Sequence, residues 1–149
     1  MKKPSGTANP SLMTCMAVEY VIDAHTLIWY IEDSPRLGIN AGNVMDDPAS
    51  ELYLPVIALA EACWAVERGR STIPSVAHLL ADVDADPRIT LLPLDRAILD
   101  RSLALIAVGE MHDRQIVATA LLRADAGASV VLLTRDANIA ATGLVPVLW

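Results

Sequence analysis

The sequence predicts an α/β fold in which a mostly parallel β-sheet is covered by helices on both faces, and three observations indicate it. Short apolar runs of strand length alternate with longer runs of helical spacing along residues 17–149. Parallel strands need a long crossover between them, and a predicted helix separates each successive pair of strands. The chain has 149 residues and shows no internal repeat or interior linker, so we expect a single domain over residues 17–149.

The first half of this domain is predicted to contain two strands and four helices. In chain order these are a strand at about 19–22, helices over 26–34 and 39–45, a strand over 52–55, and helices over 56–68 and 73–83. Pro35 ends the first helix because proline lacks a backbone N–H and clashes with the preceding turn. Gly69 closes the third helix, where a left-handed residue is favoured.

The second half continues the alternation. In chain order the elements are a strand over 89–92, helices over 97–108 and 113–126, an apolar strand over 130–133, and a last edge strand over 146–149. Asp95 is a predicted N-cap and Gly109 a predicted helix end. The continuous apolar run 130–133 is typical of a parallel strand that is covered on both faces.

The remaining features bear on location. Residues 1–16 are polar, carry two prolines and show no periodicity, so we expect a disordered tail without a signal peptide. No apolar run is long enough to span a membrane. Cys15 and Cys63 are too few for a disulfide framework or a zinc site, which favours a reducing compartment and a cytoplasmic protein.

Composition narrows the set of partners. The formal net charge is −7, from 18 acidic and 11 basic side chains, which disfavours non-specific binding to a polyanion. The lysines are Lys2 and Lys3, so the positive charges of the predicted domain are all arginines, whose planar fork suits phosphate. Apolar residues make up 54% of the chain, which agrees with a dimer face and a partner groove.

Acidic residues stand where the ends of several elements could converge. Asp23 follows the first strand, Glu61 lies early in the helix after the second strand, Asp113 opens a buried helix, and Asp136 follows the apolar strand. Taken singly, each aspartate could be an N-cap and Glu61 an exposed helix residue. Together they would repel one another unless a cation or a shared proton is present. Carboxylate oxygens select Mg²⁺ or Mn²⁺.

At these residues the sequence resembles the PIN-domain nucleases, in particular the VapC-type toxins of toxin–antitoxin pairs. The resemblance rests on the stretch from Tyr20 to Trp29, on Glu61 and the residues after it, on His112–Ala120, and on Leu133–Asp136. It implies a three-layer α/β/α sandwich around the mostly parallel sheet. It further implies a metal-dependent ribonuclease that is usually a homodimer and is silenced by a cognate antitoxin protein.

The resemblance also implies roles for individual residues. Asp23, Glu61, Asp113 and Asp136 match the acidic quartet of the family, and Asp23 and Asp113 are expected to be direct ligands of Mg²⁺ or Mn²⁺. Glu110 falls where many relatives have another aspartate and is a candidate fifth metal ligand. Substrate-binding residues are expected among Thr26, Arg114, Thr134 and Arg135. The alternative for the two threonines is binding to a carboxylate or a water, and the alternative for the two arginines is ion pairing with neighbouring carboxylates.

Two stretches depart from the family pattern. Pro55 and Ala58 stand where relatives often carry serines, and Glu110-Met111-His112-Asp113 replaces the usual Asp-Pro-Phe-Asp. Neither change removes a carboxylate of the quartet, but both would alter contacts with the substrate.

The expected function is therefore an endoribonuclease that hydrolyses RNA phosphodiester bonds with metal-activated water and acts as the toxin of a toxin–antitoxin pair. A metal-dependent DNA nuclease and a non-catalytic module that binds RNA or protein remain alternatives. The aromatic residues are expected in the core or a dimer interface rather than against bases. Helices 26–34 and 56–66 are expected to form the antitoxin groove.

Overall fold

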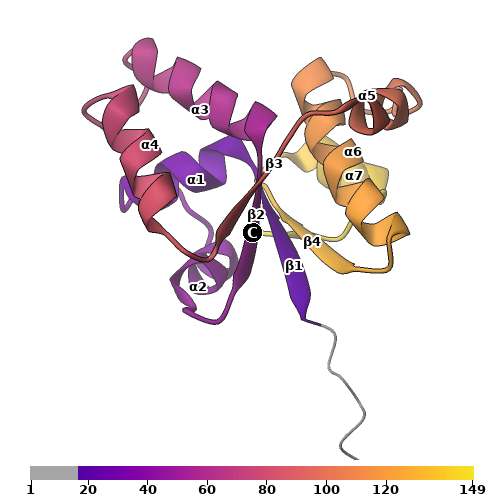
Figure 1. Ribbon diagram of the computed structural model, residues 1–149, viewed down its shortest axis with the longest axis horizontal. Helices are drawn as coiled ribbons and strands as arrows, with labels where there is room; N and C mark the ends of the chain where they lie inside the picture. The colour runs from indigo at the N-terminus through magenta and orange to yellow at the C-terminus, as the bar shows by residue number, and fades with distance from the viewer. Residues whose placement is uncertain (1–16) are drawn as a thin grey trace, which may run out of the picture.

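The computed structural model of the protein describes residues 17–149, and the tail predicted over residues 1–16 lies outside them (Figure 1). The elements in chain order are β1 (Val18–Ile22), α1 (Ala24–Ile31), α2 (Ile39–Asp46), β2 (Glu51–Pro55), α3 (Val56–Glu67), α4 (Val76–Ala85), β3 (Ile89–Leu92), α5 (Arg96–Leu103), α6 (Met111–Asp125), β4 (Ser129–Leu133), α7 (Ala137–Thr142) and β5 (Val147–Leu148).

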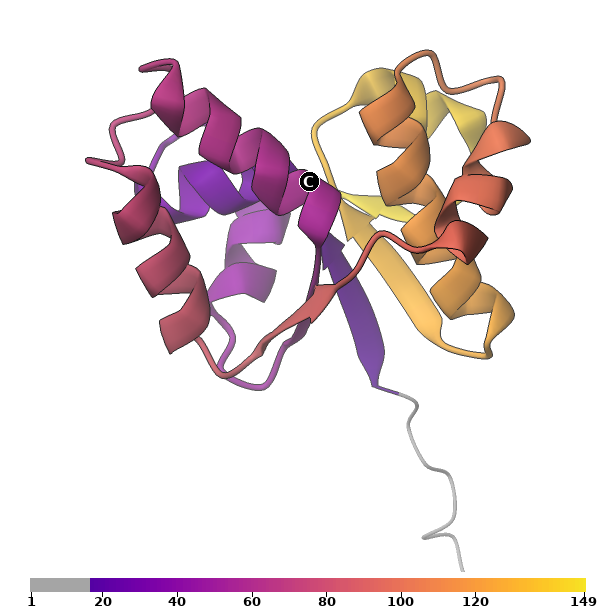
Figure 2. The ribbon, with the colours of Figure 1, turned by 45° about the horizontal axis from the view of Figure 1, so that its top comes forward.

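The strands form one sheet in the order β3-β2-β1-β4-β5, and every neighbouring pair is parallel. Helices α1–α4 lie on one side of the sheet and α5–α7 on the other, as Figures 1 and 2 show from two directions. The predicted three-layer α/β/α architecture is thus confirmed. The chain leaves β1 towards one edge and β4 towards the other, so the switch point lies between these two central strands.

The core is built from the two central strands and the helices on either side. Val21 and Ile22 of β1 and Leu132 and Leu133 of β4 have no exposed surface, as expected for strands covered on both faces. Each such side chain contributes about 1.5–3 kcal/mol through burial. The middle of α6, from Gln115 to Ala120, is buried against β4. The elements that end at the candidate site are therefore among the most rigidly held.

A polar contact holds the far end of α6 against the sheet. Arg123 donates two hydrogen bonds to Glu19 of β1, at 2.7 and 2.6 Å, and its guanidinium lies 4.6 Å from the centre of the Tyr53 ring. The first turn of the same helix carries Asp113. The contact thus fixes the C-terminal end of the helix whose first turn carries Asp113.

Several predicted helix boundaries were wrong. Helix α5 ends at Leu103 rather than at residue 108, and α4 begins at Val76, after the N-cap Ser75, whose side chain accepts a hydrogen bond from the His78 N–H. Helix α7 was not predicted at all. The last strand was predicted over 146–149 and is Val147–Leu148. None of the helices in residues 17–149 has the length and apolar character needed to cross a bilayer.

Candidate active site

The predicted carboxylates converge at the carboxyl ends of the central strands. Asp23 follows β1, Asp136 follows β4, Asp113 lies in the first turn of α6, and Glu61 lies in α3. All four line one cavity of about 1140 Å³, together with Glu110. The cavity lies between α3 on one side and the starts of α6 and α7 on the other, where the helical layers diverge in Figure 2. This is where open α/β sheets bind ligands.

Asp23 lies on the floor of this cavity and is only 7% exposed. Its Oδ1 accepts a hydrogen bond of 2.6 Å from the Ala24 N–H, so it is the N-cap of α1, and its Oδ2 accepts one of 2.6 Å from the Thr134 hydroxyl. Burial raises the pKa of Asp23 above its ordinary value, while these two hydrogen bonds oppose the rise. One oxygen of this carboxylate thus caps α1, while the other accepts the hydrogen bond from Thr134.

Thr134 connects two of the acids. Besides donating to Asp23, its hydroxyl oxygen accepts a hydrogen bond of 3.1 Å from the Asp136 N–H. The Oδ1 atom of Asp136 accepts hydrogen bonds from the N–H groups of Asn138 and Ile139, at 2.8 and 3.1 Å, and so caps α7. One hydroxyl therefore fixes the spacing between the carboxylates that follow β1 and β4.

Glu61 and Asp113 are half-buried, and their ionisation is strongly perturbed. Burial, followed by the negative charge of Asp23, raises the pKa of Glu61 from 4.5 to about 7. The same two causes, in the same order, raise the pKa of Asp113 from 3.8 to about 6. Charge repulsion among these acids shows that they share one electrostatic environment. Perturbed carboxylates in a cavity are characteristic of functional sites.

His112 joins the cluster from the residue before Asp113. Its Nδ1 lies 2.9 Å from Oε1 of Glu61, which links the start of α6 to α3 across the cavity. Both side chains line the cavity, and the histidine ring is about half-exposed. This close contact places the Glu61 carboxylate beside the first turn of α6.

The donor set fits a hydrated divalent cation. Carboxylate oxygens are the ligands that Mg²⁺ and Mn²⁺ prefer, and a cation would relieve the repulsion that raises both pKa values. Within residues 17–149, however, no group of three or more His, Cys, Asp or Glu side chains is close enough to hold one ion directly. Mg²⁺ usually retains several waters, so coordination partly through water agrees with this spacing.

Three of the four predicted substrate-binding residues do not line the cavity. Thr26 is fully buried, and its hydroxyl donates a 2.7 Å hydrogen bond to the Leu133 carbonyl, so this prediction was wrong. Arg114 is half-buried, and its Nε donates a hydrogen bond of 2.6 Å to the Val108 carbonyl, so it braces the loop before α6 instead. Thr134 is buried as well and binds the Asp23 carboxylate rather than a substrate.

Four further side chains line the cavity, of which two were predicted as site residues and two were not. Arg135 is exposed, lines the cavity and places its guanidinium 5.6 Å from the centre of the Trp29 ring. Glu110 is exposed at the N-cap position of α6. Arg36 also lines the cavity, and nothing in its sequence context, a loop after a predicted helix, indicated this. Trp64 was expected in the core or a dimer interface but lines the cavity and is half-exposed.

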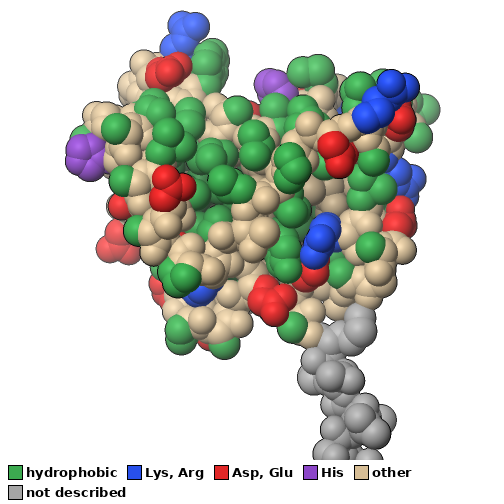
Figure 3. All heavy atoms as spheres, in the orientation of Figure 1, with side chains coloured by type: hydrophobic (Ala, Val, Ile, Leu, Met, Phe, Trp, Pro, Cys, Tyr) green, Lys and Arg blue, Asp and Glu red, His purple; other side chains and the backbone are tan. Residues whose placement is uncertain are grey.

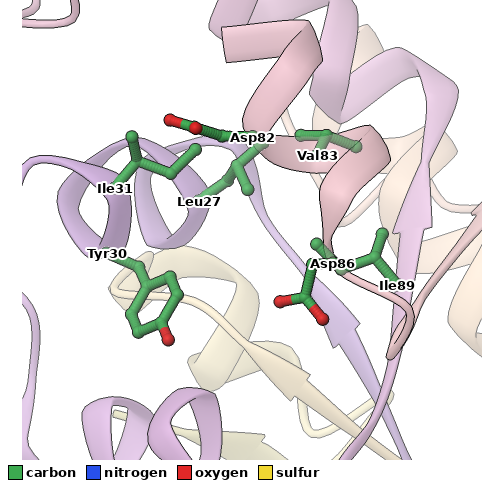
Figure 4. A pocket seen from close by; sticks show the side chains of 7 residues that line it. All are labelled: Leu27, Tyr30, Ile31, Asp82, Val83, Asp86 and Ile89. Carbon is green, nitrogen blue, oxygen red and sulfur yellow. The ribbon is translucent and has the colours of Figure 1, made fainter. Parts of the chain in front are cut away.

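A second, smaller cavity of about 300 Å³ lies between α1 and α4 (Figure 4). Apolar side chains form most of its wall, and its acids, Asp82 and Asp86, extend in different directions. Asp86 already forms an ion pair of 2.7 Å with Arg88. None of the predicted site residues lines this cavity, so it is separate from the carboxylate cluster.

Comparison with known families decides the classification. The model of the PIN domain family matches residues 20–144, a span that includes all the carboxylates of the cluster. The chain belongs to the PIN-domain family. A search among curated proteins found no match. Membership rests on the family match and on the fold.

Solved structures agree with this PIN fold. VapBC2 from Rickettsia felis, bound to a DNA fragment from its promoter, superimposes with a TM-score of 0.66 at 13% identity, over 88% of this chain and 98% of the other. A toxin–antitoxin complex from Klebsiella pneumoniae gives 0.62 at 18% identity, over 87% and 96%. VapC20 from Mycobacterium tuberculosis, a toxin that cleaves the sarcin–ricin loop, gives 0.61 at 11% identity, over 83% and 95%.

Proposed function

We propose that this PIN domain is a divalent-metal-dependent endoribonuclease and the toxin of a toxin–antitoxin pair. The observation that carries the proposal is the convergence of Asp23, Glu61, Asp113 and Asp136 in one cavity, where burial and the neighbouring negative charges raise the pKa values of Glu61 and Asp113. Repulsion within such a cluster costs stability, and a bound cation would relieve it. The family match supports the same chemistry.

The carboxylates divide into two groups by their environment. Asp23 is held by the cap of α1 and by Thr134, and Asp136 by the cap of α7, so both carboxylates have a fixed orientation. Asp113 and Glu61 reach in from the helices and complete the donor set. Bound Mg²⁺ or Mn²⁺ would neutralise phosphate charge and lower the pKa of an attacking water. Hydrolysis would leave a 5′-phosphate and a 3′-hydroxyl.

RNA is the proposed substrate despite the net charge of −7. Arg36, Arg70 and Arg135 line the cavity around the carboxylates, so guanidinium groups are present where a phosphate backbone would enter. The Mycobacterium tuberculosis neighbour is a toxin that cleaves an RNA loop, which supports RNA over DNA. Neighbours solved as toxin–antitoxin complexes support an antitoxin partner. A cytoplasmic homodimer completes the proposal.

The direct test compares the purified, antitoxin-free protein with its Asp113→Asn variant on total cellular RNA, in Mg²⁺, Mn²⁺ or EDTA, followed by sequencing of the new 5′ ends. We expect discrete cuts that need the metal. The variant should lose about 100-fold or more in rate, because a carboxylate that binds the cation is replaced by a weaker neutral ligand.

Asp84→Asn is the matched control, because Asp84 is an exposed acid on α4 that does not line the cavity. It should cut like the wild type. Cuts that persist in EDTA, or in Asp113→Asn at the wild-type rate, would overturn the proposal. Metal-dependent cutting of single-stranded DNA but not RNA would instead identify a DNA nuclease.

A further inference from the structure

Trp64 occupies an unusual place for a tryptophan. It lies on α3 one helical turn after Glu61, so both side chains leave the same face of the helix, about 5–6 Å apart at their Cβ atoms. Its side chain is 48% exposed and lines the same cavity as the carboxylates. An aromatic side chain exposed at the wall of a cavity can stack a nucleobase.

Two arginines accompany this ring. The guanidinium carbon of Arg68 lies 4.9 Å from the ring centre and that of Arg70 lies 5.1 Å from it. Gly69, between them, has a φ of +66°, which ends α3 and turns the chain back so that the N–H of Arg70 donates to the Ala65 carbonyl. The helix end therefore gathers a half-exposed aromatic ring, with two guanidiniums lying over it, at one side of the cavity.

We propose that Trp64 stacks a nucleobase of single-stranded RNA close to the scissile phosphate, while Arg68 and Arg70 contact the neighbouring backbone phosphates. The inference rests on the proposed ribonuclease function and assigns a base-binding subsite to it. Aromatic stacking and cationic contacts to the backbone are the two interactions by which proteins bind single strands. Both are present here, next to a carboxylate of the site.

The arrangement fits RNA better than a protein partner. The RNA strand must enter the carboxylate cavity to be cut, and Trp64 and Arg70 form part of the wall of that cavity. Phosphates at regular spacing on either side of a base match an aromatic ring flanked by guanidiniums.

The test measures binding without cleavage. The full-length Asp113→Asn protein is titrated against a labelled single-stranded RNA by fluorescence anisotropy, alone and with Trp64→Ala, Trp64→Leu or Trp64→Phe added. Trp64→Ala and Trp64→Leu should weaken binding about 10-fold to 100-fold, and Trp64→Phe much less, since stacking needs a flat aromatic face. Leu103→Ala, which removes a side chain 65% exposed outside the cavity, should bind like the parent.

A series of RNAs with one abasic nucleotide at each position separates stacking from a structural role. At one position the abasic change should weaken binding to the parent but not to Trp64→Ala. In that variant the base at this position has already lost the ring on which it stacks. Additive losses at every position, or unchanged affinity of both Trp64→Ala and Trp64→Leu, would overturn the inference. Equal melting temperatures show that the variants are folded.

The nuclease and the stacking subsite can fail separately. Metal-dependent cutting by the wild type without coupling at any abasic position would leave the nuclease and remove the subsite. Coupling at one position in a protein that never cuts RNA would keep the subsite and remove the nuclease.

Discussion

At the scale of single residues, the raised pKa of Glu61 makes the stability of the protein depend on pH. The pKa of its carboxyl is raised from 4.5 to about 7 in the folded chain, so between these values the folded state binds more protons than the unfolded state. The free energy of unfolding then falls as pH rises through this range. Asp113 acts in the same direction up to about pH 6. The lowered pKa of Asp86 has its effect below 3.8, outside this range.

We therefore expect the metal-free protein in EDTA to melt at a lower temperature at about pH 8 than at about pH 6. Glu61→Gln should flatten this dependence, because glutamine does not titrate. Added Mn²⁺ should stabilise the wild type more at the higher pH, where protons no longer compete for the carboxylates. The measurement is thermal unfolding followed by circular dichroism across this range.

Glu67→Gln is the control, since Glu67 is exposed on the same helix and does not line the cavity. It should keep the wild-type pH dependence. If Glu61→Gln also kept it, the perturbed ionisation of the cluster would have to reside elsewhere.

The residue scale also shows where sequence reasoning succeeds and where it stops. The acids could be placed because each follows a strand or opens a helix, and parallel strands deliver their carboxyl ends to one edge. Thr26 could not be placed in the same way. It is close to Asp23 in sequence, but its helix directs it into the interface with β4, where it meets the Leu133 carbonyl. Proximity in sequence did not give the direction of a side chain.

At the scale of elements, the start of α2 is held by a close approach to Trp149. Gly38 is the N-cap residue of α2, and a Cβ added there would lie 2.6 Å from the Trp149 backbone carbon and 2.6 Å from its Cδ1. Trp149 also packs edge-on against Trp29, with ring centres 5.7 Å apart, and its carbonyl accepts a 2.9 Å hydrogen bond from Asn40. The segment after β5 thus buttresses α1, whose N-cap is Asp23.

Two glycine-to-alanine changes at this helix should have opposite effects. Gly38→Ala should lower the free energy of unfolding by about 1–3 kcal/mol, because Trp149 must move away to make room. Gly42→Ala should raise it by about 0.5–1 kcal/mol, because Gly42 lies inside α2 and the nearest atom, Cδ2 of Leu37, is 3.6 Å away. Urea denaturation of both variants checks the signs. A neutral Gly38→Ala would show that the contact with Trp149 is not maintained in solution.

The elements themselves were predictable to the degree that they show periodicity. Long amphipathic helices and apolar strands repeat their pattern often enough to be recognised. Helix α7 has 6 residues and buries only Ile139, which is too short a stretch for a helical pattern. The overlong prediction for α5 has a related cause. Apolar residues continue to Val108, but after Leu103 the chain leaves the helix, and Leu105 and Val108 are buried from a loop.

At the scale of the whole molecule, hydrophobic side chains gather on the face that carries β3. Figure 3, in the orientation of Figure 1, shows them near the centre of this face. Val56, Leu91, Leu94 and Leu99 each expose more than 40% of their surface, and we call these residues the β3 patch. Strand β3 is also an edge of the sheet. Proteins usually cover an apolar edge strand, because it invites further pairing.

The proposed homodimer should therefore form through the β3 patch. Leu94→Glu, at the end of this edge, should convert the dimer to a monomer, because it would bring two like charges into an apolar interface. Sedimentation velocity across a range of protein concentrations measures the change. Ile39→Glu is the control, since Ile39 is 78% exposed on α2 and lies outside the patch, so it should leave the assembly unchanged. A Leu94→Glu protein that still sediments as a dimer would place the interface elsewhere, while a wild type that is monomeric at all concentrations would remove the dimer from the proposal.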